Sequence, residues 1–185
     1  MKTLLSIDLD YWTNCYKHYN LNGATFIHMM FQHLPKVWVI DNHHKILDLI
    51  PKGTERIVNI DYHNDILGES AFDDYYNKND DLNEGTWGNF LPKSVERFEW
   101  FYPQHKKCVT EKGGLCCDEN GKVWYDYPLE YYQKLHFASC DFTGVDSMVI
   151  CISPEWASLS SPDSYLQTIY VDPIQDFSNP VKIKG

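Results

Sequence analysis

The chain is short of positive charge. Its 185 residues include 16 Lys and Arg against 26 Asp and Glu, which gives a formal net charge of −10 at pH 7. A general nucleic-acid-binding protein needs a basic face, so we expect no nucleic-acid partner. An acidic chain is better suited to metal ions or cationic substrates, although net charge mostly reports solubility.

Long apolar runs are also missing. Met1-Lys2-Thr3 is followed by only a short apolar run before Asp8, which does not match a secretory signal. No stretch approaches the roughly 20 apolar residues that span a bilayer. We therefore expect a cytoplasmic protein with no membrane partner.

The cysteines lack the paired C-x-x-C spacing of zinc knuckles. Cys108, Cys116 and Cys117 flank a Gly-rich turn and could bind zinc, but reduced cytoplasmic thiols are the better interpretation. Cys140 and Cys151 lie in apolar, strand-like runs, so we expect reduced core residues.

No internal repeat, low-complexity tract or clear linker divides the chain, so we expect one domain over residues 1–185. Continuous apolar runs alternate with helical patterns, which predicts an α/β fold with a mostly parallel sheet. Strands are expected at 4–9, 37–40, 56–61, 135–140 and 148–152, and helices at 25–34, 44–50, 86–101 and 162–169. Other expected features are an irregular aromatic loop at 11–22, an acidic loop at 68–85, a hairpin of 107–109 with 122–124, and a surface tail from Asp172.

Four of the apolar runs lead directly into polar side chains. These sequences are Asp8-Leu9-Asp10, Asp41-Asn42-His43-His44, Asp61-Tyr62-His63-Asn64-Asp65 and Ser153-Pro154-Glu155. Sites in open α/β sheets gather just past the carboxyl ends of the strands. Such runs would therefore deliver carboxylates and imidazoles to one edge of the sheet.

Asp61-x-His63-x-Asp65 is the strongest of these motifs. Residues two apart in an extended segment point to the same face, so Asp61 and His63 can address one site while Asp65 curls back. Carboxylates with one or two imidazoles suit Mn²⁺, with Fe²⁺, Co²⁺ or Zn²⁺ as alternatives. Two such ions can activate a water molecule at neutral pH.

Each motif also has a simpler explanation when taken alone. Asp8-x-Asp10 at a strand end is often a helix cap or a turn, and His43-His44 is more often a surface pair. The occurrence of these motifs after three apolar runs favours a dinuclear metal site.

The motifs resemble those of the ureohydrolases, the arginase and agmatinase family. Asp61 to Asp65 resembles the D-x-H-x-D motif, Asp41-Asn42-His43 the Gly-Asp-His element, and Ser6 to Asp10 the S-x-D-x-D element. With Ile152 to Glu155, the set is most similar to a smaller arginase-like branch that includes peptide arginases. Those enzymes convert arginine residues of ribosomally made peptides into ornithine.

The resemblance implies a minimal three-layer arginase-like fold and two Mn²⁺ ions. It assigns His43, Asp61, Asp65 and Asp8 to one ion, and His63, Asp61, Asp8 and Asp10 to the other; His44 is the alternative to His43.

Glu155 would orient the substrate guanidinium through two parallel hydrogen bonds, and Asp65 would pass a proton to the leaving amine. Glu84 and Asn89 are further candidates for substrate contacts, although Gly85 and Thr86 could simply begin a helix. A proton shuttle could be His44, His105 or His136.

The chain departs from the family pattern in several ways. S-x-D-x-D precedes D-x-H-x-D here, so the chain looks circularly permuted, which a sheet with nearby termini tolerates. Asn42 stands before the ligand histidine where the family has Asp. The chain is also much shorter than arginases, and segments that grip a free amino acid are not evident.

The short chain and its aromatic loops favour an arginine-containing precursor peptide over free arginine. Those loops contain Tyr11, Trp12, Tyr16, Tyr19, Tyr75, Tyr76, Trp124, Tyr125, Tyr127, Tyr131 and Tyr132, and aromatic residues are common at recognition surfaces. The alternatives are a ureohydrolase of free arginine or agmatine, a one-zinc deacetylase of the same fold, a two-metal phosphoesterase or nuclease, and a non-enzymatic interaction module. The oligomeric state stays open.

Overall fold

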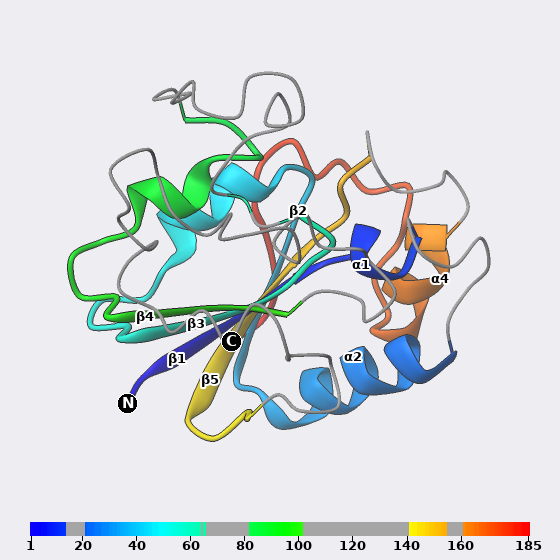
Figure 1. Ribbon diagram of the computed structural model, residues 1–185. Coiled ribbons are helices and arrows are strands. Elements are labelled where there is room, and N and C mark those ends of the chain that lie inside the picture. The colour runs from blue at the N-terminus through cyan, green and yellow to red at the C-terminus, as the bar shows by residue number, and fades with distance from the viewer. Residues whose placement is uncertain (14–20, 64, 66–81, 102–140, 155–160) are drawn as a thin grey trace, which may run out of the picture.

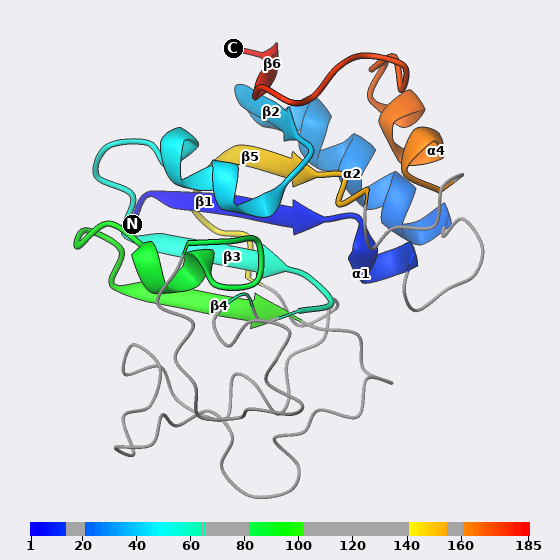
Figure 2. The same cartoon turned by 90° about the horizontal axis from the view of Figure 1, so that it is seen from above.

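The computed structural model describes residues 1–13, 21–63, 65, 82–101, 141–154 and 161–185. Within these residues, a six-stranded sheet has the order β4-β3-β1-β5-β2-β6 (Figure 2). The strands are β1 (Thr3–Asp8), β2 (Lys36–Ile40), β3 (Arg56–Ile60), β4 (Arg97–Phe101), β5 (Val145–Cys151) and β6 (Val181–Lys184). All pairings are parallel except β2 with β6. The carboxyl ends of β1 to β5 therefore lie along one edge.

Both faces of the sheet are covered (Figure 1). Helices α2 (Leu21–His33) and α4 (Ser161–Thr168) lie on one face, and the 3-10 helices η1 (His43–Leu49) and η3 (Trp87–Phe90) lie on the other. Every residue of β1 and β3 is buried, as expected for parallel strands covered on both sides. This arrangement confirms the predicted α/β fold with a mostly parallel sheet, and it is consistent with three layers.

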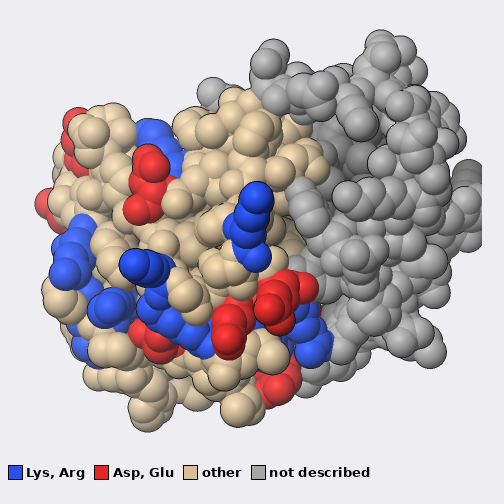
Figure 3. All heavy atoms as spheres, turned by 90° about the vertical axis from the view of Figure 1, so that its left-hand side faces the viewer, with Lys and Arg blue, Asp and Glu red and all other residues tan. Residues whose placement is uncertain are grey.

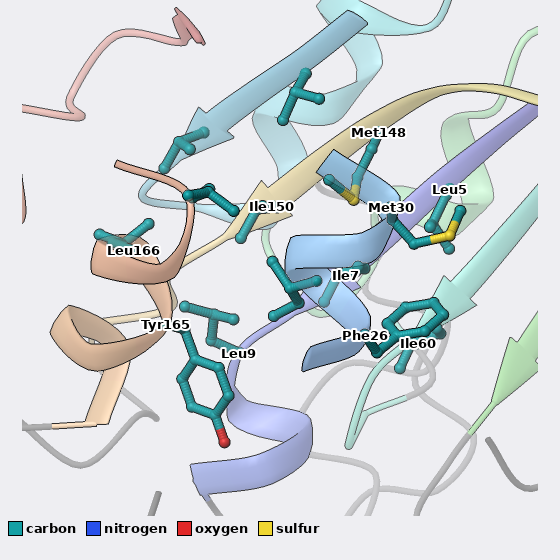
Figure 4. Close-up of a cluster of buried hydrophobic side chains, with 14 of the residues drawn as sticks. Leu5, Ile7, Leu9, Phe26, Met30, Ile60, Met148, Ile150, Tyr165 and Leu166 are labelled. Atoms are coloured by element: carbon teal, nitrogen blue, oxygen red, sulfur yellow. The ribbon is translucent and has the colours of Figure 1, made fainter. Parts of the chain in front are cut away.

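Side chains alternate between two cores along each strand. Leu5 and Ile7 of β1 meet Phe26 and Met30 of α2 and Tyr165 of α4 in the larger core (Figure 4). Leu4 belongs to the smaller core beneath the 3-10 helices, with Ile46, Trp87, Phe98 and Cys151 among its members. Ser6 and Asp8 lie two and four residues after Leu4, so their side chains point to the same face of the sheet. This is the face that η1 and η3 cover.

Two predicted elements were wrong. Residues 86–101 are not one helix, because η3 ends at Phe90 and residues 97–101 form β4. Leu91-Pro92 interrupts the helical pattern, since a residue before proline disfavours helical backbone. The segment from Asp172 is not only a surface tail, because Val181–Lys184 adds β6 to the edge of the sheet.

The predicted aromatic loop at 11–22 is also partly helical. Helix α1 spans Asp10–Thr13, and α2 begins at Leu21. Tyr11 and Trp12 are only 5% and 3% exposed, and Trp12 stacks on Tyr165 with ring centroids 5.5 Å apart. These two aromatic residues therefore belong to the core and not to a recognition surface.

Several predictions fall outside the described residues. They concern the hairpin of 107–109 with 122–124, the strand at 135–140, most of the acidic loop at 68–85, and Cys108, Cys116, Cys117 and Cys140. Cys151 is a buried free cysteine, as predicted. In the part of the chain that the structure describes, no helix is both long and apolar enough to cross a membrane.

Candidate metal centre

Three adjacent strands point polar side chains to the face of the sheet that η1 and η3 cover. Asp8 pairs in register with Cys151, and Ile7 pairs with Ile60, which precedes Asp61. The four aspartates at positions 8, 10, 61 and 65 are between 1% and 5% exposed. Parallel strand order thus gathers carboxylates from distant sequence positions in a buried cluster.

His43 lies at the centre of this cluster. It begins η1, whose N-cap residue Asn42 accepts a hydrogen bond from the His44 backbone N–H at 3.3 Å. His43 is 2% exposed, and its Nδ1 lies 2.9 Å from Asp65 Oδ2, 3.1 Å from Asp61 Oδ2 and 3.2 Å from Asp8 Oδ2. None of these oxygens meets the geometry of a hydrogen bond to Nδ1.

The other ring nitrogen of His43 has its own partner. Nε2 lies 2.6 Å from the Ser6 hydroxyl, in the layer of residues behind the site. If Nε2–H donates to Ser6, the lone pair of Nδ1 points toward the carboxylates, and this is the orientation of a metal-binding imidazole. His43, and not His44, therefore faces the cluster.

A second group forms on the other side of Asp61. His63 Nδ1 lies 2.8 Å from Asp10 Oδ2. The backbone N–H of His63 donates to Asp61 Oδ1 at 2.8 Å, and that of Tyr62 to Asp10 Oδ1 at 3.2 Å. The side chain of His63 is 35% exposed, whereas Asp10 is 1% exposed. The cluster consequently reaches solvent on the His63 side.

Asp65 is held by η3 and by an unusual backbone. Its φ of 56° lies in the left-handed region, which is costly for a residue with a side chain and is often found at functional sites. The Trp87 indole donates to Asp65 Oδ2 at 2.5 Å, and the Gly88 N–H donates to the Asp65 carbonyl at 2.9 Å. The Trp87 ring also packs on His43, with centroids 4.8 Å apart.

Asp8 is held from the end of β5. The Ser153 hydroxyl donates to Asp8 Oδ2 at 2.5 Å and lies 3.3 Å from Cys151 Sγ. Ser153 has a φ of 42°, so it is a second buried residue with left-handed backbone at this site. The backbone N–H of Asp10 donates to Asp8 Oδ1 at 2.9 Å.

The protonation of the carboxylates reflects their crowding. Burial, followed by the charges of Asp65 and Asp8, raises the pKa of Asp61 from 3.8 to about 7. Burial and the charges of Asp8 and Asp61 raise the pKa of Asp10 well above its usual value. Without a metal ion, the cluster therefore tends to hold protons near neutral pH.

His43 and Asp8 shift in the directions of an ion pair. Burial lowers the pKa of His43, but the surrounding carboxylates, led by Asp65, raise it well above the usual value. Burial raises the pKa of Asp8, but His43 and the hydrogen bond from Ser153 bring it below the usual value. A positive charge is stabilised at the point where the carboxylates converge.

Two overlapping groups of side chains could hold a metal ion. Asp10, Asp61 and His63 form one group and His43, Asp61 and Asp65 form another, with the ligand atoms of each group within 4.8 Å of one another. Asp61 belongs to both groups, as a bridging carboxylate would. Carboxylate and imidazole ligands suit Mn²⁺, Fe²⁺ and Zn²⁺, and Nδ1 of His43 has no hydrogen bond that a metal ion would have to break.

The remaining predicted residues have different positions. Glu84 is half-buried and accepts a hydrogen bond from the Asn42 side chain, next to His43. Asn89 is exposed on η3, and Thr86 occupies the N-cap position, in agreement with the simpler explanation of this segment as a helix start. Glu155, His105 and His136 lie outside the described residues.

Sequence reasoning missed the residues that hold the ligands in place. Trp87, Asn59 and Ser153 each bond a carboxylate of the cluster. Asn59 and Ser6 could have been recognised, because each is a polar residue in a buried strand two positions before an aspartate. Trp87 gave no such signal, since it lies 22 residues from Asp65 and resembles an ordinary core residue.

The comparisons with known proteins give no relative. No family model, no curated protein and no solved structure matches this chain. The residues of the site and the motif resemblance therefore carry the functional proposal.

Proposed function

We propose that this protein is a dinuclear metal-dependent hydrolase that converts arginine residues of a peptide to ornithine and releases urea. The observation that carries the proposal is the pair of overlapping ligand groups that share Asp61. The arginine substrate is supported by motif resemblance and by the acidic character of the site. The metal proposal is supported by geometry as well.

His43, Asp65, Asp61 and Asp8 would hold one Mn²⁺, and His63, Asp10, Asp61 and Asp8 would hold the other. When bound, such a pair of ions lowers the pKa of water and stabilises negative charge that develops during hydrolysis. Four carboxylates against two imidazoles leave an excess of negative charge once all are ionised. Two divalent ions would compensate that excess.

Side chains of the protein would transfer the proton and bind the substrate. Asp65 would pass a proton to the leaving amine, and the hydrogen bond from Trp87 fixes the orientation of its carboxylate. Glu84 accepts a hydrogen bond from Asn42, the residue before His43, and its carboxylate would accept hydrogen bonds from a guanidinium. Glu155 is proposed for the same guanidinium from the segment after β5.

The reversed order of the motifs along the chain is compatible with a permuted arginase-like fold. β1, which leads into Asp8 and Asp10, lies directly beside β3, which leads into Asp61 and His63. Adjacent strands give the same ligand arrangement whichever of them comes first in the sequence. The spatial relation needed for the proposed site is thus independent of the permutation.

A peptide substrate is preferred because the ligand cluster opens on the partly exposed side chain of His63. An arginine side chain could reach inward from a peptide that stays outside. Tyr11 and Trp12 are buried, so these two aromatic residues do not contribute to a peptide-binding surface.

The test is mass spectrometry of products after incubation with Mn²⁺-loaded protein. An arginine-containing peptide, the same peptide with lysine replacing arginine, and free arginine would be compared. We expect ornithine and urea from the first peptide only. Citrulline instead of ornithine, or no conversion of either arginine substrate, would contradict the proposal, and conversion of free arginine alone would remove its peptide part.

Metal content gives an independent measurement. We expect two ions per chain after loading and dialysis. One Zn²⁺ per chain without urea release would favour a deacetylase, and the absence of bound metal would favour a non-enzymatic interaction module.

A further inference from the structure

Cys151 lies between the strands that deliver two of the proposed ligands. It ends β5, and its register partners are Asp8 on β1 and Ile40 on β2, three residues before His43. Its side chain shares the face of the sheet that η1 and η3 cover. Strand order therefore places the sulfur on the side of the sheet where Asp8 and His43 meet.

The sulfur is within reach of both side chains. Asp8, His43 and Cys151 each offer a ligand atom, and these atoms lie within 4.8 Å of one another in a fully buried group. Ligands around one tetrahedral ion, at about 2.0–2.3 Å from it, are separated by roughly 3.3–3.8 Å. The three side chains would therefore move inward on binding an ion, and a fourth position would stay open.

The surroundings of the sulfur are more polar than those of an ordinary core cysteine. Sγ lies 3.6 Å from the Asp41 carbonyl oxygen and 3.3 Å from Ser153 Oγ, which in turn bonds Asp8. A separate observation also indicates a ligand. His43 Nδ1 is buried without a hydrogen-bond partner and lies 3.2 Å from Oδ2 of Asp8, which belongs to the same group as Cys151.

We infer that Cys151 is an additional ligand of the metal ion that Asp8 and His43 would share. Binding would release the thiol proton to solvent, and the sulfur would donate an electron pair to the metal. A thiolate favours Zn²⁺, Co²⁺ or Fe²⁺ over Mn²⁺, so the ion bound by Cys151 would be one of these alternatives and not Mn²⁺. The inference rests on the proposed metal centre, but it does not depend on arginine as the substrate.

The test uses Co²⁺ as a spectroscopic probe added to metal-free protein. Cobalt gives weak visible bands with any ligand set and an intense near-ultraviolet charge-transfer band only with thiolate. We expect both signals in the unmodified protein. Cys151→Ala should lose the near-ultraviolet band and keep the visible bands.

Matched variants guard against other cysteines and against misfolding. A Cys108→Ser, Cys116→Ser, Cys117→Ser triple variant should keep the near-ultraviolet band. Cys151→Ser preserves size and polarity and should also lose that band, while circular dichroism shows an unchanged fold. Persistence of the band in both Cys151 variants would overturn the inference.

Failure of this inference differs from failure of the proposed function. Visible bands without a charge-transfer band in the unmodified protein would exclude Cys151 as a ligand and leave the metal centre standing. The absence of both signals would overturn the metal centre and this inference together.

Discussion

The two ends of the sheet both bury charge, but they balance it differently. Toward the amino ends of β3 and β4, Arg56 donates to Glu99 through Nε at 3.1 Å and Nη2 at 2.5 Å. Arg56 also donates to the carbonyl oxygens of Asp141 and Thr143, and Arg97 pairs with Glu99. At the carboxyl ends, four buried aspartates face two histidines.

This difference separates a structural ion pair from the proposed metal site. The Arg56 and Glu99 charges compensate each other, and their hydrogen bonds offset the cost of burial. The carboxyl-end cluster instead raises the pKa of Asp61 and Asp10. Carboxylates that repel one another in a buried position are compensated best by cations from outside the chain.

The exposed surface at the amino end agrees with this comparison. Figure 3 shows that face, where Lys and Arg atoms lie beside Asp and Glu atoms. The N-terminal amine lies 3.6 Å from Glu55 Oε2, and the backbone N–H of Lys2 donates to the same oxygen at 3.1 Å. Charges of both signs are thus interspersed among the described residues of this face.

The largest effect should come from removing the carboxylate shared by the two ligand groups. Asp61→Ala should abolish urea release and binding of the second metal ion while the fold survives, because repulsion among buried carboxylates decreases. Urea assays, metal analysis and circular dichroism would measure this. The exposed Asp48→Asn variant is the control, and retained activity in Asp61→Ala would refute the assignment of Asp61 as a ligand.

A change at the amino end should reduce stability without affecting metal binding. Arg56→Met leaves Glu99 partly uncompensated, so unfolding in urea should become easier by about 3 kcal/mol. The double variant Arg56→Met, Glu99→Leu should recover most of that loss, since Arg97 is 35% exposed and can be solvated. A double variant as unstable as the single one would show that ion pairing is not the cause.

The smallest effect should come from a residue that only orients a ligand. Trp87→Phe removes the indole hydrogen bond to Asp65, and the metal dissociation constant should increase about 10- to 100-fold. Trp100→Phe is a matched control, because its indole donates to the backbone carbonyl of Asp61 and not to a carboxylate. Equal losses of metal affinity in the two variants would contradict a specific role for Trp87.

Much of the scaffold could be predicted from local patterns. The apolar runs ending at Asp8, Ile40, Ile60 and Cys151 became strands because both faces of the sheet are covered. The segment 86–101 was mispredicted because Phe98 and Trp100 fit a helical period as well as an alternating one. Pairing of β4 with β3 decides between them, and that pairing is not local information.

The candidate site likewise contains residues that could be predicted from the sequence and residues that could not. Aspartate and histidine residues after strands were identifiable from the chemistry of metal ligands and from residue spacing. The choice between His43 and His44 was not, because it depends on the direction of η1 relative to the sheet. Ser153 and Trp87 were missed because their partners lie 145 and 22 residues away.

The sequence by itself determined which residue types follow the buried strands, because short-range patterns set strand ends and the polar residues beyond them. Only the tertiary structure decided that β1, β3 and β5 are neighbours, and hence that Asp8, Asp61 and Cys151 share one space. The physical reason is that strand order is set by the packing of whole layers. No single segment carries that information.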